Sequence, residues 1–264
     1  MYLKSANAVW SAVRMLFKSW TTLPLLVAIY VALLLAVYLF ISTREATVPQ
    51  LILTFTMMLA APLLFFLLQA VSVNYVNGSS GLVPKALRDC LKFIVVSLPV
   101  IALTLLAAYG LGKLMGRITI DPETSLPSSP NVLTTLVVLR YLLIGVIAPL
   151  VTIQLWIATS TRGLRELIRS LPKTLAAAFA PQAVLVFAFG FLIFAVAPYF
   201  LLAQTIPIQR TWLEVSVFTV RVVLSALLIL IGWVVTIGAL SILSTRTEEI
   251  PVTATTEEAP VTQT

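Results

Sequence analysis

The 264-residue sequence contains no histidine, one cysteine and only ten acidic residues. Without histidine, the chain lacks the commonest general base, proton relay and metal ligand of proteins. The single thiol, Cys90, excludes an internal disulfide and a multi-cysteine metal site. The sequence also lacks G-x-S-x-G, H-E-x-x-H and the glycine loops that bind phosphate. We therefore expect a protein that is not an enzyme and that holds no cofactor and no metal.

Charge is equally scarce, because charged residues make up 10% of the chain and apolar residues 60%. Soluble domains carry about 25% charged residues, and a helix needs about 20 apolar residues to cross a bilayer. Six stretches satisfy that length, so we predict an all-α polytopic membrane protein with six transmembrane helices. The expected spans lie near residues 23–41, 51–75, 93–112, 130–159, 181–202 and 213–243, and the fifth should be kinked near Pro198.

The basic residues set the predicted orientation. Eleven of the 17 fall on one side of the six spans and six on the other, and basic loops stay in the cytoplasm. Both termini should therefore be cytoplasmic, in a bacterial inner membrane. The net charge of +7 then indicates contact with anionic lipid and not with nucleic acid. The larger set is Lys4, Arg14, Lys18, Lys85, Arg88, Lys92, Arg162, Arg165, Arg169, Lys173 and Arg246.

An internal repeat is visible in these basic segments, since one precedes the first, third and fifth spans. We predict a single transmembrane domain over residues 1–246, made of three parallel units of about 1–77, 78–160 and 161–246. Each unit would be a basic interfacial helix followed by a helical hairpin. Residues 247–264 are acidic and rich in threonine, with no aromatic residue, and should form a disordered cytoplasmic tail.

The basic segments are amphipathic at helical spacing. Residues 5–20 place an apolar stripe through Ala6, Trp10 and Phe17, which predicts either a helix in the headgroup plane or an extension of the first span. In the middle segment, Cys90 lies on the apolar face and should be buried, whereas Asp89 lies on the polar face. Anionic lipid and a cytoplasmic or membrane protein are the two candidate partners for the basic side chains Lys85, Arg88, Lys92, Arg162, Arg165 and Arg169.

Two arginines lie within the predicted spans, which makes them candidate functional residues. Arg140 precedes Arg162 by 22 residues, roughly 33 Å of helix, so it should reach the outer surface of a core about 30 Å thick. Arg221 is placed similarly with respect to Arg246. Both arginines can therefore snorkel outward. Alternatively, Arg140 and Arg221 could line an outward-facing cleft with Glu214 and hold an anionic headgroup.

In its six spans and basic helices, the chain resembles uncharacterised bacterial six-span membrane proteins. It is similar, for example, to the repeat-built membrane domain attached to some glycerophosphodiester phosphodiesterases. No phosphodiesterase domain is present, so that resemblance implies no hydrolase activity. The amphipathic helix between spans two and three also resembles type-2 ABC exporter permeases, which would place Lys85–Lys92 against an ATPase. We expect a non-enzymatic scaffold or accessory subunit; the alternative is a transporter subunit for an amphiphilic or anionic substrate.

Overall fold

The computed structural model describes residues 2–43, 47–77, 82–118, 130–204 and 211–248, and every regular element in those ranges is a helix. Within them, six helices are long and apolar enough to cross a membrane. This confirms the all-α fold with six transmembrane helices. The predicted acidic tail lies outside the described residues from position 249 onward. The spans are Thr22–Ser42, Val48–Asn74, Leu82–Met115, Asn131–Arg162, Pro181–Ala203 and Trp212–Thr245.

The helices group into two compact units. One, called the central unit here, is the continuous segment Ser19–Ala180. The other, the terminal unit, combines Met1–Lys18 with Pro181–Thr264. The predicted division into three repeats of one domain is a different grouping and stays a prediction.

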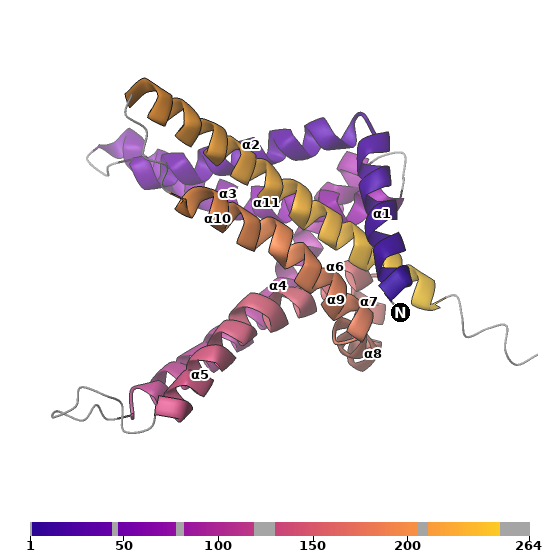
Figure 1. Ribbon diagram of the computed structural model, residues 1–264. Helices are drawn as coiled ribbons and strands as arrows, with labels where there is room; N and C mark the ends of the chain where they lie inside the picture. Colours follow the sequence, from indigo (N-terminus) through magenta and orange to yellow (C-terminus); the bar gives the residue numbers. More distant parts are fainter. Residues whose placement is uncertain (1, 44–46, 78–81, 119–129, 205–210, 249–264) are drawn as a thin grey trace, which may run out of the picture. The chain divides into compact units, whose positions relative to one another are not determined.

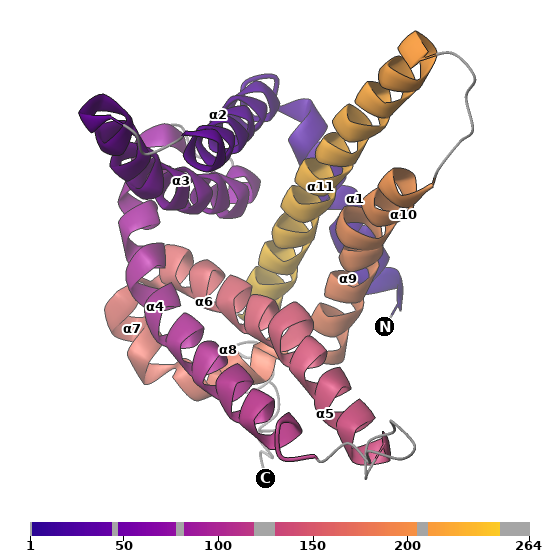
Figure 2. The ribbon, with the colours of Figure 1, turned by 90° about the vertical axis from the view of Figure 1, so that its left-hand side faces the viewer.

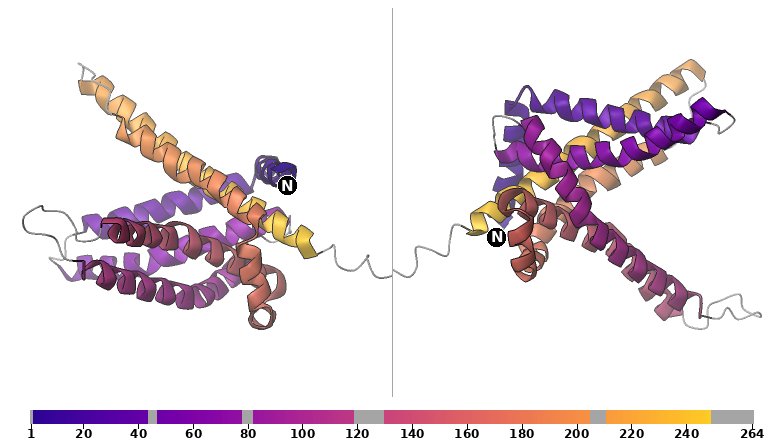
Figure 3. Two further views of the ribbon diagram at one scale, coloured as in Figure 1. Left: turned by 60° about the horizontal axis from the view of Figure 1, so that its bottom comes forward. Right: turned by 180° about the vertical axis from the view of Figure 1, so that it is seen from behind.

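The central unit holds four of the spans. Helix α2 packs along α3, α3 contacts the beginning of α4 at its own end, and α4 runs beside α5 and α6 (Figures 1 and 2). After α6 the chain turns at Gly163, whose φ of 83° suits glycine. The short helices α7 and α8, in salmon, consequently cross the end of α6 instead of continuing it (Figure 3). The bounds are α2 Thr22–Ser42, α3 Val48–Asn74, η1 Tyr75–Asn77, α4 Leu82–Met115, α5 Pro130–Leu142, η2 Leu143–Ile147, α6 Ala148–Arg162, α7 Leu164–Arg169 and α8 Leu171–Ala178.

The terminal unit joins the first helix of the chain to the last two spans. Helix α1 packs against α11 and α9, and α9–α10 runs beside α11 (Figure 1). The bounds are α1 Tyr2–Lys18, α9 Pro181–Phe191, η3 Leu192–Val196, α10 Ala197–Ala203 and α11 Thr211–Glu248.

The buried face of α1 differs from its predicted apolar stripe. Ser5, Ala8, Ala12 and Leu16 are buried, whereas Trp10 is 69% exposed. Small side chains let helices approach closely in a membrane, and large apolar ones face lipid. Helix α1 is also separate from α2, since non-helical residues follow its last residue, Lys18.

Glycines bring α9 and α11 into close contact. A Cβ added at Gly190 would lie 2.0 Å from Thr236 Oγ1, and one added at Gly232 would lie 3.0 Å from side-chain atoms of Ile193 and Phe194. These distances leave no room for a larger residue. Gly190 of α9 is therefore packed against the side chain of Thr236, and Gly232 of α11 against Ile193 and Phe194 of η3, as small-residue interfaces in membranes allow.

Two spans contain a π-helical turn directly before an Ala-Pro pair. Turn η2 precedes Ala148-Pro149, and η3 precedes Ala197-Pro198. Proline has no N–H and its ring clashes with the carbonyl four residues earlier, so the hydrogen bonds shift to a five-residue spacing. The kink predicted near Pro198 stays a prediction, and neither π turn was predicted from the sequence.

Candidate functional site

Three helices of the central unit meet along rows of residues spaced four apart, which we call the seam. Helix α3 contributes Asn74, Ala70 and Phe66, α4 contributes Asp89, Phe93 and Ser97, and α6 contributes Ser160 and Trp156. Residues four apart lie on the same helix face, one turn above the other. The seam therefore has a polar layer at one end and an aromatic layer one turn further in.

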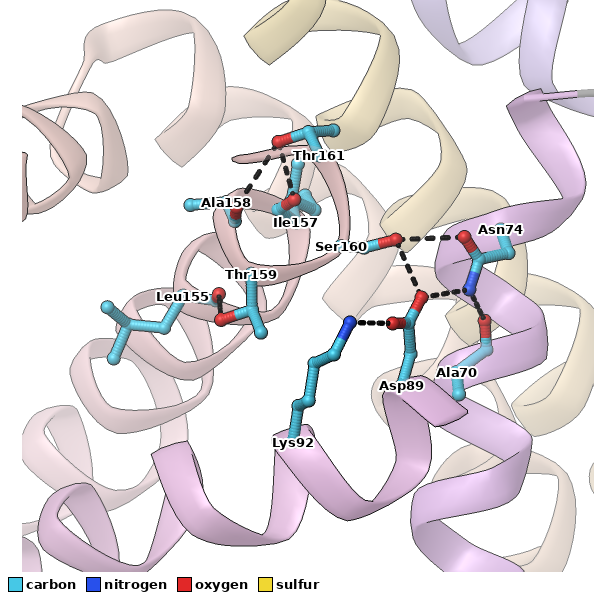
Figure 4. A network of polar contacts seen from close by, with 10 residues as sticks. All are labelled: Ala70, Asn74, Asp89, Lys92, Leu155, Ile157, Ala158, Thr159, Ser160 and Thr161. Atoms are coloured by element: carbon cyan, nitrogen blue, oxygen red, sulfur yellow. Dashed lines mark hydrogen bonds and ion pairs between the residues drawn. The ribbon is translucent and has the colours of Figure 1, made fainter. Parts of the chain in front are cut away.

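The polar layer is centred on the carboxylate of Asp89, which is only 2% exposed (Figure 4). Asn74 Nδ2 donates to Asp89 Oδ2 at 3.0 Å and also to the carbonyl of Ala70 at 3.0 Å. The Ser160 hydroxyl lies 2.8 Å from Asn74 Oδ1 and 3.1 Å from Asp89 Oδ2, so it can donate to either. Lys92 Nζ pairs with Asp89 Oδ1 at 2.7 Å. Both carboxylate oxygens are thus engaged.

The aromatic layer is centred on Trp156. Its ring stacks on Phe93, with centroids 5.5 Å apart and planes inclined by 10°. Phe65 and Phe66 meet the indole edge-on at 6.5 and 6.2 Å. The indole Nε1 donates to Ser97 Oγ at 2.8 Å, which satisfies the polar end of the tryptophan inside the bundle.

The polar groups of the seam bind one another and hold α3, α4 and α6 together. A buried carboxylate is stable only when paired and hydrogen-bonded, and Asp89 has an ammonium group, an amide and a hydroxyl around it. Just beyond Asn74, burial raises the pKa of the Tyr75 phenol. Within the described residues, no group of three His, Cys, Asp or Glu side chains could hold a metal ion.

Sequence periodicity misplaced Asp89. It is predicted to lie on the polar face, but it is buried, while the large apolar side chains of Leu87 and Leu91 on the same helix are 53% and 65% exposed. The reason is that a helix at a membrane turns large apolar residues to lipid and its polar contacts toward protein. The prediction for Cys90 is confirmed, since this thiol is buried and donates to the carbonyl of Leu63 at 3.7 Å.

The structure brings the middle and third basic segments to the same end of the central unit. The contact between Asp89 and Ser160 joins the start of α4 to the end of α6, where these segments lie. The basic side chains of the two segments make different contacts. Lys92 is paired with Asp89 and Arg162 Nη1 donates to Ser170 Oγ at 3.2 Å. Lys85 is half-buried, and Arg88, Arg165 and Arg169 are exposed.

The three residues proposed to line an outward-facing cleft are divided between the units. Arg140 is exposed on α5 of the central unit, whereas Glu214 and Arg221 belong to α11 of the terminal unit. The half-buried Arg221 donates to the main-chain oxygen of Gln204, the residue at which α10 ends. A cation at a helix C-terminus is favourable because the last carbonyls carry partial negative charge. Arg221 therefore caps α10.

Sequence reasoning missed Asn74, Phe93, Trp156 and Ser160. One available signal was the four-residue spacing of Asp89, Phe93 and Ser97, which places an acid, an aromatic ring and a hydroxyl on one helix face. Comparison of the chain with protein-family models, curated proteins and solved structures gave no match. Its function therefore has to be inferred from its own residues.

Proposed function

We propose that this integral membrane protein is a non-enzymatic scaffold or accessory subunit of a bacterial cytoplasmic membrane. The observation that carries the proposal is the seam. Its buried carboxylate is engaged by Asn74 of α3, Lys92 of α4 and Ser160 of α6. These polar groups hold three helices together, which supports a structural role for the seam.

The positions of the basic segments support a cytoplasmic assignment for one end of the central unit. Arg88, Arg165 and Arg169 are exposed at the end where α4 begins and α6 finishes, and Lys113 lies near the opposite end of α4. A cytoplasmic basic end follows from the retention of lysine and arginine on that side. We infer that both termini are cytoplasmic as well.

The orientation can be tested with single cysteines. In a Cys90→Ser background, Lys173→Cys in α8 should react with a membrane-impermeant maleimide only after the cells are opened. Lys113→Cys is the matched control and should react in intact spheroplasts. The reverse pattern would refute the orientation.

The role itself can be tested by purifying the tagged protein from its native membrane in mild detergent and identifying what accompanies it. The proposal expects a membrane protein or lipid in constant ratio and no ATPase. A stoichiometric ATPase would contradict it and establish the permease alternative. In that case, Lys85→Glu combined with Arg88→Glu should release the ATPase, and the same change at Lys113 and Arg117 should not.

A further inference from the structure

The outer surface of α7 and α8 carries a row of cations. Ser170 ends α7 and begins α8, because its N–H donates to Glu166 O and its carbonyl accepts from Thr174 N, both at 3.0 Å. Arg165 and Arg169 lie four residues apart on one face of α7, and Lys173 lies in the first turn of α8. All three side chains are exposed.

The two flanks of this row differ. On the side toward the bundle, Leu167, Thr174 and Ala178 are buried, and Leu167 packs in the core cluster with Val96 of α4. Beside the cations, large apolar side chains are exposed. They are Ile168 at 76%, Leu171 at 41% and Phe179 at 53%.

The position of α7 and α8 in the chain sets their depth. They connect the span that ends at Arg162 to the span that begins at Pro181, so we infer that this segment lies at the membrane surface. A surface at that depth with cations beside exposed apolar side chains matches a bilayer interface. Phosphates would meet the cations, and the apolar residues would enter the acyl boundary.

We propose that Arg165, Arg169 and Lys173 form a binding surface for the headgroups of anionic phospholipids. The proposal rests on the proposed function and deepens it, because it assigns lipid contact to this row and not equally to all basic segments. Guanidinium groups bind phosphate in a bidentate manner, and the two arginines lie one turn apart. By contrast, Lys92 is committed to Asp89 inside the seam.

The test uses the full chain in detergent and measures, by native mass spectrometry, its apparent affinity for phosphatidylglycerol and for phosphatidylcholine with the same acyl chains. Wild-type protein should prefer phosphatidylglycerol. The triple variant R165Q/R169Q/K173Q should lose that preference, by roughly five-fold per cation and on the order of 100-fold in total. The matched control K113Q/R117Q/R140Q removes the same charge elsewhere in the central unit and should keep it.

Three results would overturn the proposal: no preference in the wild type, a preference retained by the triple variant, or equal losses in the variant and the control. The charge-conserving variant R165K/R169K should keep a preference for phosphatidylglycerol, weaker than that of the wild type because lysine does not bind phosphate in a bidentate manner, and it shows that the segment tolerates substitution. Because the lipid test uses purified protein, its failure leaves co-purification of a partner unaffected. An ATPase found by co-purification would remove the proposed function without changing the lipid preference.

Discussion

Replacing Gly190 by alanine should destabilise the contact between α9 and α11. The new Cβ would lie 2.0, 2.8 and 2.9 Å from Oγ1, Cγ2 and Cβ of Thr236, whereas ordinary contact begins at 3.4 Å. The helices would have to separate by about 1.4 Å if the threonine kept its position. Rotation of that side chain would break its 2.6 Å hydrogen bond to the carbonyl of Gly232 and would leave its Cβ in the way.

The magnitude follows from three terms. Overpacking of this kind costs about 1–3 kcal/mol, and losing the Thr236 hydrogen bond costs about 1 kcal/mol. The higher helix propensity of alanine stabilises the helix by up to about 1 kcal/mol, which offsets part of this loss. We therefore expect the free energy of unfolding to fall by about 1–3 kcal/mol. Tryptophan fluorescence during titration of mixed micelles with a denaturing detergent would measure it.

Gly112 provides the matched control, because a Cβ added there meets nothing within 4 Å. Gly112→Ala should leave stability unchanged or raise it by up to about 1 kcal/mol. A double-mutant cycle sharpens the test. Thr236→Ala should destabilise the wild type and stabilise the Gly190→Ala variant, since it removes two of the three close atoms. Equal stability of the two alanine variants, or the same sign for Thr236→Ala in both backgrounds, would refute the predicted clash.

Further substitutions address the seam and the cap of α10. Asp89→Asn should lower the free energy of unfolding by about 1–3 kcal/mol, because an amide that keeps its oxygen toward Asn74 turns a donor toward Lys92 and leaves that ammonium without its counter-ion. Trp156→Phe should cost about 1 kcal/mol by leaving the buried Ser97 hydroxyl without its donor. Arg221→Gln should cost about 0.3–1 kcal/mol, through loss of the cation at the end of α10. The same unfolding titration measures all three.

Each of these changes has an exposed counterpart that makes the same chemical alteration. Glu166→Gln, Trp20→Phe and Arg140→Gln should each shift stability by no more than about 0.5 kcal/mol. If Asp89→Asn lowered the free energy of unfolding no more than Glu166→Gln does, the polar layer would not be what holds the three helices together. Likewise, the hydrogen-bond assignment for Trp156 would be contradicted if Trp156→Phe lowered the free energy of unfolding no more than Trp20→Phe does. The same holds for Arg221→Gln compared with Arg140→Gln.

The spans were predictable because hydropathy and length are properties of the sequence alone. The uncharged windows gave five of the six spans within three residues of their bounds, and the prediction of a buried Cys90 was confirmed. The third helix begins at Leu82, eleven residues before the predicted start of its span, because the basic segment continues into the span as one helix. The faces of the helices were less predictable. Apolar periodicity does not tell a lipid-facing side from a protein-facing one, since both are apolar.

Residue size and polarity carry the missing information. In α1 the buried face is the one with Ala8 and Ala12, and in α4 it is the one with Ala86 and Asp89. Choosing the face with small and polar residues would have placed both helices correctly. The contact between Asp89 and Ser160 could not be predicted, because the two residues are 71 positions apart and nothing local in the sequence specifies that they meet.

The composition of the terminal unit has a consequence for biogenesis. Helix α1 is made before the central unit, yet its partner α9 begins only after that unit and its partner α11 ends at Glu248, about 230 residues after Lys18. At 5–20 residues per second, α1 waits roughly 12–46 s before both partners exist. During that interval α1 must lie at the bilayer surface or bind to the insertion machinery. A fusion placed at the N-terminus would therefore disturb the last step of assembly instead of the first.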